Sequence, residues 1–144
     1  AWKARERGIL FDIGHGMSSF DFGVVETAIG EGFLPDSIST DFYLRHAQST
    51  PRHDMPRTMS KLIAAGMKET DAFERATLRP ARTLGLDGDV GSLGAGMAAD
   101  LAVIRWNPEA APLADVAGTE RPGGCWEPVL TVRAGQTVEA TMPG

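Results

Sequence analysis

The pattern of apolar and polar residues predicts two short strands that each end beside a residue capable of chemistry. Residues 9–13 form a nearly continuous apolar run that stops at Gly14 and is followed by His15. Such a run is typical of a strand buried on both faces of a parallel sheet. A second short strand is predicted over residues 37–40, directly before Asp41.

A helix is predicted between these two strands. Phe20, Val24 and Ala28 recur at helical spacing and are expected to face the sheet. Ser18 or Ser19 is expected to cap the first turn. A strand, a helix and a strand in succession make one βαβ unit, so the two strands should run parallel and end at the same rim.

His15 and Asp41 should therefore lie near each other and face a common pocket. In α/β barrels the catalytic residues sit at the carboxyl ends of the strands. Residues 42–56 follow as an irregular polar loop. A loop of that length at such a rim is typical of a wall or lid over a substrate.

The remainder of the chain is predicted to be helical first and rich in strands afterwards. Helices are expected over residues 58–66, 69–77 and 81–84. Strands are expected over residues 100–106, 128–133 and 136–140, the last two as a hairpin. The Pro- and Gly-rich residues 107–124 are expected to form a long surface excursion.

Composition and charge narrow the classes of function. The chain has 144 residues, 42% hydrophobic and 23% charged, which is typical of a soluble globular domain. A net charge of −5 without a basic cluster argues against nucleic acid as a partner. No apolar stretch approaches the roughly 18 residues that span a bilayer, and the charged residues 1–8 lack the apolar core of a signal peptide, so we expect no membrane partner and a cytoplasmic location. Cys125 is the single cysteine, which excludes an internal disulfide.

Four motifs carry a resemblance to a known family. They are residues 7–16 (RGILFDIGHG), 35–41 (PDSISTD), 58–61 (TMSK) and 91–101 (GSLGAGMAADL). In this order they resemble the C-terminal portion of an enzyme of the amidohydrolase superfamily, in its dihydroorotase-like amidohydrolase/deacetylase branch. The last motif occurs throughout the superfamily, whereas the first two together point to this branch.

The resemblance implies an α/β fold made of the last two β/α units of a metal-dependent (β/α)8 barrel and the C-terminal part of a small β-sandwich. The barrel portion would cover residues 1–87 and the sandwich portion residues 88–144. A complete barrel needs roughly 250 residues. In the family a His-x-His pair, a bridging lysine and two further histidines come from earlier strands, and none has a counterpart here. Lys61 is not that lysine, because it follows Asp41 and lies off any strand end.

The resemblance also implies roles for three residues. Asp41 matches the family's strand-eight aspartate, which binds metal and accepts the proton of the attacking water. His15 matches the strand-seven histidine position, and with Gly16 it is expected to face the substrate. The implied reaction is hydrolysis of an amide or ester bond in a small acyl substrate, through water activated by a divalent metal, in this case zinc.

Other interpretations of these residues stay open. Asp41 is also compatible with a helix cap or a loop aspartate, and His15 with a structural histidine bonded to the backbone. His46 and His53 are expected to be solvated loop residues, and Asp12 to be structural.

Two hypotheses about the whole protein follow. In the first, the chain is part of a hydrolase, is inactive alone and has at most weak metal affinity, because one carboxylate and one imidazole cannot make a closed site. In the second, it is a truncated non-catalytic barrel remnant or ligand-binding module that self-associates through exposed strand edges. We therefore expect either a homo-oligomer or a dependence on the missing N-terminal part.

Overall fold

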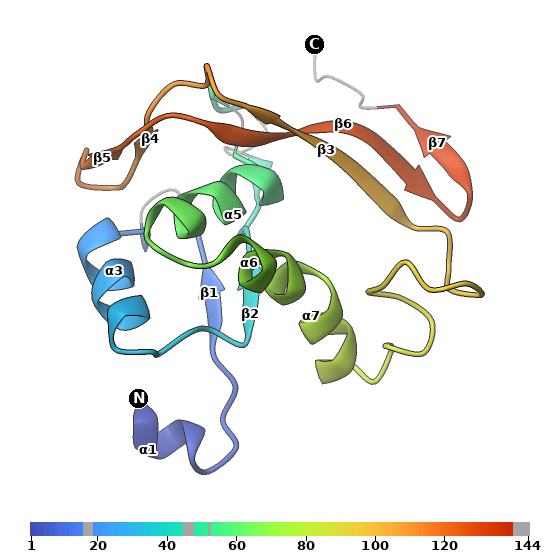
Figure 1. Cartoon of the computed structure of the whole chain (residues 1–144), viewed down its shortest axis with the longest axis horizontal. Helices are drawn as coiled ribbons and strands as arrows, with labels where there is room; N and C mark the ends of the chain where they lie inside the picture. The colour runs from blue at the N-terminus through green and yellow to red at the C-terminus, as the bar shows by residue number, and fades with distance from the viewer. Residues whose placement is uncertain (16–18, 45–47, 52, 140–144) are drawn as a thin grey trace.

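The structure is a computed structural model that describes the chain except for residues 16–18, 45–47, 52 and 140–144. A pair of parallel strands is covered by helices, and a long antiparallel sheet arches over the same helices (Figure 1). The short α1 (Trp2–Arg5) lies at the end of the molecule away from this sheet (Figure 1). The predicted α/β class is confirmed.

The first two strands are parallel neighbours, as predicted. β1 (Asp12–Gly14) pairs with β2 (Ser37–Ser39) in a register that places Ile13 opposite Ile38. β1 is shorter than predicted, and the apolar residues 9–10 before it are about half exposed. The prediction of burial on both faces is wrong, because within the described chain this sheet has only two strands and helices cover one face.

The connecting helix, α3 (Phe22–Gly30), begins later than predicted. Its N-cap is Asp21, whose Oδ1 accepts a hydrogen bond from the backbone N–H of Val24 at 2.9 Å. Within this helix the buried residues are Phe22 and Val25, whereas the side chain of Val24, which was predicted to face the sheet, is exposed. The predicted cap at Ser18 or Ser19 is wrong, because a carboxylate at position 21 satisfies the first turn directly.

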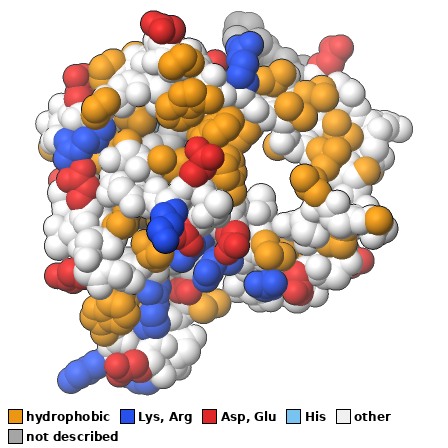
Figure 2. Space-filling view, in the orientation of Figure 1, with side chains coloured by type: hydrophobic (Ala, Val, Ile, Leu, Met, Phe, Trp, Pro, Cys, Tyr) orange, Lys and Arg blue, Asp and Glu red, His pale blue; other side chains and the backbone are white. Residues whose placement is uncertain are grey.

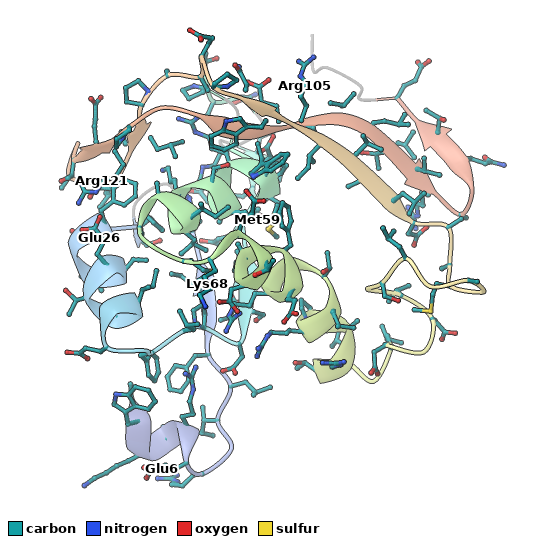
Figure 3. The ribbon with its side chains drawn as sticks, in the orientation of Figure 1. Glu6, Glu26, Met59, Lys68, Arg105 and Arg121 are labelled. Atoms are coloured by element: carbon teal, nitrogen blue, oxygen red, sulfur yellow. The ribbon has the colours of Figure 1, made fainter. Side chains whose placement is uncertain are left out.

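Later in the chain come the helices α5 (Met55–Ala64), α6 (Glu69–Ala76) and α7 (Leu78–Thr83). α5 begins three residues earlier than predicted, since Asp54 caps it and Pro56 stands in its first turn. Its inward face, which includes the labelled Met59, packs beneath the antiparallel sheet (Figure 3). None of the helices in the described part of the chain is long and apolar enough to cross a membrane.

The antiparallel sheet has the order β3 (Leu101–Asn107), β6 (Cys125–Arg133), β7 (Gln136–Val138). The predicted hairpin is confirmed. Its two-residue turn places Ala134 and Gly135 at φ values of 50° and 78°, which suits the right-handed twist of the strands.

The segment between β3 and β6 is more ordered than the predicted surface excursion. It contains a small hairpin of β4 (Leu113–Ala114) and β5 (Glu120–Arg121). Leu113 is 1% exposed and belongs to the main core. Arg121 forms a two-pronged ion pair with Glu26 of α3, with N···O distances of 2.5 and 2.8 Å (Figure 3). One core therefore joins residues from both predicted regions, and the boundary at residue 87 stays a prediction.

Candidate active site at the strand ends

The candidate site begins where β1 and β2 end. Pairing continues one residue beyond β1, since the His15 backbone N–H donates to the Ser39 carbonyl at 3.2 Å. Asp41 follows two residues after β2, with an exposed side chain and a backbone φ of 49°. A left-handed backbone is uncommon outside glycine, and such positions cluster at functional sites. Asp41 is therefore held in an unusual conformation at the rim where catalytic residues are expected.

Asp41 shares one face of the strand pair with a second carboxylate. A Cβ built on Gly14 would lie 3.8 Å from Asp12 Oδ2 and 4.0 Å from Asp41 Cβ. Asp12 accepts hydrogen bonds from the hydroxyls of Ser37 and Ser39 at 2.7 and 2.5 Å. Asp12 therefore ties β1 to β2, which agrees with its predicted structural role.

The His15 side chain lies on the other face and is 3% exposed. Its Nδ1 lies 2.7 Å from Nε2 of His53, and its ring stacks on Phe20 with centroids 4.8 Å apart. Alternation along a strand explains this placement, because His15 has the same parity as the core residue Ile13. The predicted solvation of His53 is wrong, since it is 6% exposed.

The structure does not bring Asp41 and the His15 imidazole into one pocket. His15 and His53 line a pocket of about 200 Å³, and Asp41 is absent from the described residues that line it. The prediction of a common pocket is therefore wrong for these two side chains, although their strands are neighbours. Gly16 and His46 lie outside the described residues.

The same pocket contains a buried cation that the sequence did not single out. Lys61 of α5 lines it and is 7% exposed. Burial, and secondarily the positive charge of Arg57, lowers the pKa of Lys61 from 10.5 to about 8. The apolar pattern carried no signal for this burial, since the buried residues of α5 also include the polar Thr58 and Ser60.

A metal site would need ligands beyond those that the structure describes. Within residues 1–15, 19–44, 48–51 and 53–139, no three His, Cys, Asp or Glu side chains come together as a metal site. Asp41 offers one exposed carboxylate, a ligand type that suits zinc and harder divalent ions. Its position fits one ligand of such a site, and the set is incomplete.

Comparison with known proteins agrees with the motif resemblance. The model of the amidohydrolase family matches residues 23–138. A deacetylase of Enterococcus faecalis is 40% identical over 121 residues, which are 84% of this chain and 32% of that protein. A deacetylase of Agrobacterium fabrum is 44% identical over 104 residues, which are 72% of this chain and 25% of that protein.

Solved structures give the same result for the fold. The crystal structure of an adenine deaminase superposes with a TM-score of 0.84 at 37% identity, covering 96% of this chain and 38% of that one. A dihydroorotase superposes with a TM-score of 0.79 at 36% identity, covering 95% of this chain and 37% of that one. The chain spans about a third of the length of the relatives that it matches.

Proposed function

This chain belongs to the amidohydrolase family, and we propose that it is the C-terminal portion of a metal-dependent hydrolase of the deacetylase or cyclic amidase type. The bond cleaved is an amide or an ester in a small acyl compound. Deacetylases three to four times as long as the matched region support this proposal. In it, β1 and β2 are the last two strands of a (β/α)8 barrel, and β3, β6 and β7 belong to a flanking β-sandwich.

One observation carries the proposal: Asp41 is an exposed carboxylate at the carboxyl end of a parallel strand. Its left-handed backbone and the missing side chain of Gly14 leave space beside it. A general base must come within hydrogen-bond reach of the proton that it removes. We assign to Asp41 the removal of a proton from the attacking water and one bond to the metal.

A bound divalent metal, zinc in this proposal, supplies a Lewis acid that polarises the substrate carbonyl and acidifies water. Asp41 is the ligand that this chain provides, and the remaining ligands come from the longer protein. Asp12 keeps β1 and β2 in register through its two serine hydrogen bonds. It thereby fixes the strand end from which Asp41 projects.

Substrate binding by His15 and Gly16 stays a prediction. The His15 imidazole bonds to His53, which directly precedes the cap of α5. This bond connects the end of β1 to the loop after β2. In our proposal His15 therefore shapes the wall of the substrate site by fixing that loop.

A screen of the full protein tests the proposal. Metal-loaded protein is assayed against N-acetyl amides, O-acetyl esters and small cyclic amides, and its metal content is measured. We expect turnover that a chelator removes and that added zinc restores. Protein that holds no metal and hydrolyses none of these compounds would contradict the proposal.

A non-catalytic, self-associating module is the second candidate, and the apolar surface favours it. A hollow of about 690 Å³ opens between the helices and the antiparallel sheet, lined by apolar residues that include Phe73, Leu93 and Ile104. Figure 2 shows hydrophobic side chains gathered around this hollow and along the sheet. Surfaces of this kind are commonly covered by another chain or segment. A monomer in sedimentation analysis would contradict this candidate.

A further inference from the structure

The pocket beside His15 is assembled from four separate parts of the chain. They are the end of β1, the loop that precedes α5, one face of α5 and the residues that follow β4. Its volume of about 200 Å³ is below the roughly 300 Å³ at which pockets for drug-sized ligands begin. Its size therefore suits a small ion or a small organic acid.

Two cations of α5 face this pocket. Arg57 and Lys61 are four residues apart, so they lie on the same side of the helix. Among the described residues, neither the Arg57 guanidinium nor the Lys61 ammonium has a hydrogen bond or an ion pair. The Lys61 ammonium lies 5.4 Å from the ring centre of Phe20. The negative charge of Asp115 favours the Lys61 ammonium, but burial and the charge of Arg57 disfavour it. A buried ammonium without an ion pair among the described residues is costly, and a bound anion would offset this cost.

The acidic residue in the pocket wall does not serve as this anion. Asp115 lines the pocket, but its carboxylate already accepts three backbone N–H groups. They belong to Phe22, Ala117 and Thr119, at 3.1, 2.9 and 2.8 Å. No ion pair joins Asp115 to Lys61 within the part of the chain that the structure describes.

The remaining polar wall consists of imidazoles and hydroxyls. The bond between His15 and His53 holds one proton between two imidazole rings. Ser49 and Thr50 add hydroxyl groups, and that of Ser49 donates to the Pro51 carbonyl at 3.2 Å. The two cations and the Thr50 hydroxyl around a small cavity are a favourable set for an oxygen-bearing anion.

We propose that this pocket binds a small oxyanion, a carboxylate or inorganic phosphate, between Lys61 and Arg57. The anion satisfies the buried ammonium and accepts from the half-buried guanidinium. Asp41 is absent from the described residues that line this pocket. The pocket is a binding site and needs no metal.

Anion titration of the metal-free full protein tests the proposal. Sodium acetate and inorganic phosphate are titrated in separate arms by isothermal calorimetry, with chloride as the reference for unspecific charge effects. We expect saturable one-to-one binding of at least one of the two, and the arm that binds more tightly identifies a carboxylate or a phosphate site. Because the metal is removed, failure of the hydrolase proposal does not affect this measurement.

Variants of the two cations locate the binding. Lys61→Met is expected to weaken the anion about tenfold or more, and Arg57→Gln several-fold. Lys61→Arg keeps the charge and should retain most of the affinity. The matched control is Lys68→Met, which removes an exposed cation at the start of α6 (Figure 3) and should leave binding unchanged. Absence of saturable binding of both anions, or equal binding by wild type and Lys61→Met, would overturn the proposal.

Discussion

The two faces of the β1–β2 pair hold their polar residues in opposite ways. On one face, Asp12 and Asp41 are exposed, and Asp12 is satisfied by neighbouring serine hydroxyls. On the other face, His15 and Lys61 are buried and line the same pocket. Strands of a parallel sheet are normally covered on both faces. The exposed carboxylate face is therefore the side on which more protein, or a substrate, is expected.

This difference separates a residue with a proposed catalytic role from residues whose burial affects stability. Carboxylates on the exposed face keep most of their hydration, but the backbone of Asp41 is strained there. On the buried face, Lys61 loses its hydration. Strain on one side is conformational and on the other electrostatic. Substitutions that relieve each kind of strain separately can tell the two roles apart.

The largest expected effect is on catalysis by the exposed face. Asp41→Asn keeps the shape of the side chain but cannot accept a proton as a carboxylate does. We expect kcat of the metal-loaded full protein to fall about 10³-fold, within the usual range for loss of a general base. The matched control, Asp89→Asn, changes an exposed carboxylate elsewhere and should leave kcat unchanged. Near-normal turnover by Asp41→Asn would remove this residue from the mechanism.

The next effect is on stability and belongs to the buried face. His53→Ala removes the ring that bonds to His15 and leaves a gap in the pocket wall. We expect a loss of about 2 kcal/mol in the free energy of unfolding, measured by urea denaturation. Asp41→Asn should change this free energy by less than about 0.5 kcal/mol, as expected for an exposed side chain. Equal losses in the two variants would erase the contrast between the faces.

An effect of similar size and opposite sign is expected from Lys61. Its folded-state pKa of about 8 lies below its ordinary value of 10.5. The unfolded chain therefore binds more protons between these two pH values, and the free energy of unfolding should rise as pH increases from 8 to 10. Below about pH 8 the charged lysine exerts its full cost. Lys61→Met should stabilise the protein at pH 7 by about 1–3 kcal/mol and remove this pH dependence.

A stabilisation at pH 7 would also bear on the anion site. A residue that reduces stability but is required for binding an oxyanion serves the ligand rather than the fold. If Lys61→Met instead destabilises the protein and its pH profile matches that of wild type, the ammonium is not desolvated as the structure indicates.

The smallest effect tests the backbone at Asp41. Asp41→Gly relieves the left-handed conformation and should add about 0.5–1 kcal/mol to the free energy of unfolding. Ala134→Gly is a matched comparison, because Ala134 has nearly the same φ in the turn before β7. Both should gain stability by a similar amount in thermal unfolding, and only the change at Asp41 should reduce turnover. A loss of stability in Asp41→Gly alone would mean that the carboxylate holds the loop.

Local patterns in the sequence predicted the order of the elements and the direction of the first two strands. Strand, helix and strand in close succession leave one favourable topology, so the parallel pair of β1 and β2 followed directly. The turn at Ala134 and Gly135 was likewise recognisable from a short stretch of residues. Both features depend on neighbours in sequence.

Features that depend on distant contacts were not predictable from the pattern. His15 and His53 are 38 residues apart, and their contact depends on how the loop after β2 folds back. The apolar spacing of Phe20, Val24 and Ala28 was misleading because Asp21 rather than Ser18 or Ser19 caps α3. Lys61 became significant only when the structure showed that its ammonium is buried.

Metal binding by the full protein is the most direct test of the account, whose central claim is that Asp41 is a metal-binding catalytic carboxylate. Zinc content and affinity are measured for wild type, Asp41→Asn and Asp89→Asn by mass spectrometry and competition with a chelator. We predict that wild type and Asp89→Asn bind zinc equally, and that Asp41→Asn binds at least about tenfold more weakly, since even outer partners of a metal site contribute 10–100-fold. Equal zinc affinity in all three proteins would contradict the claim.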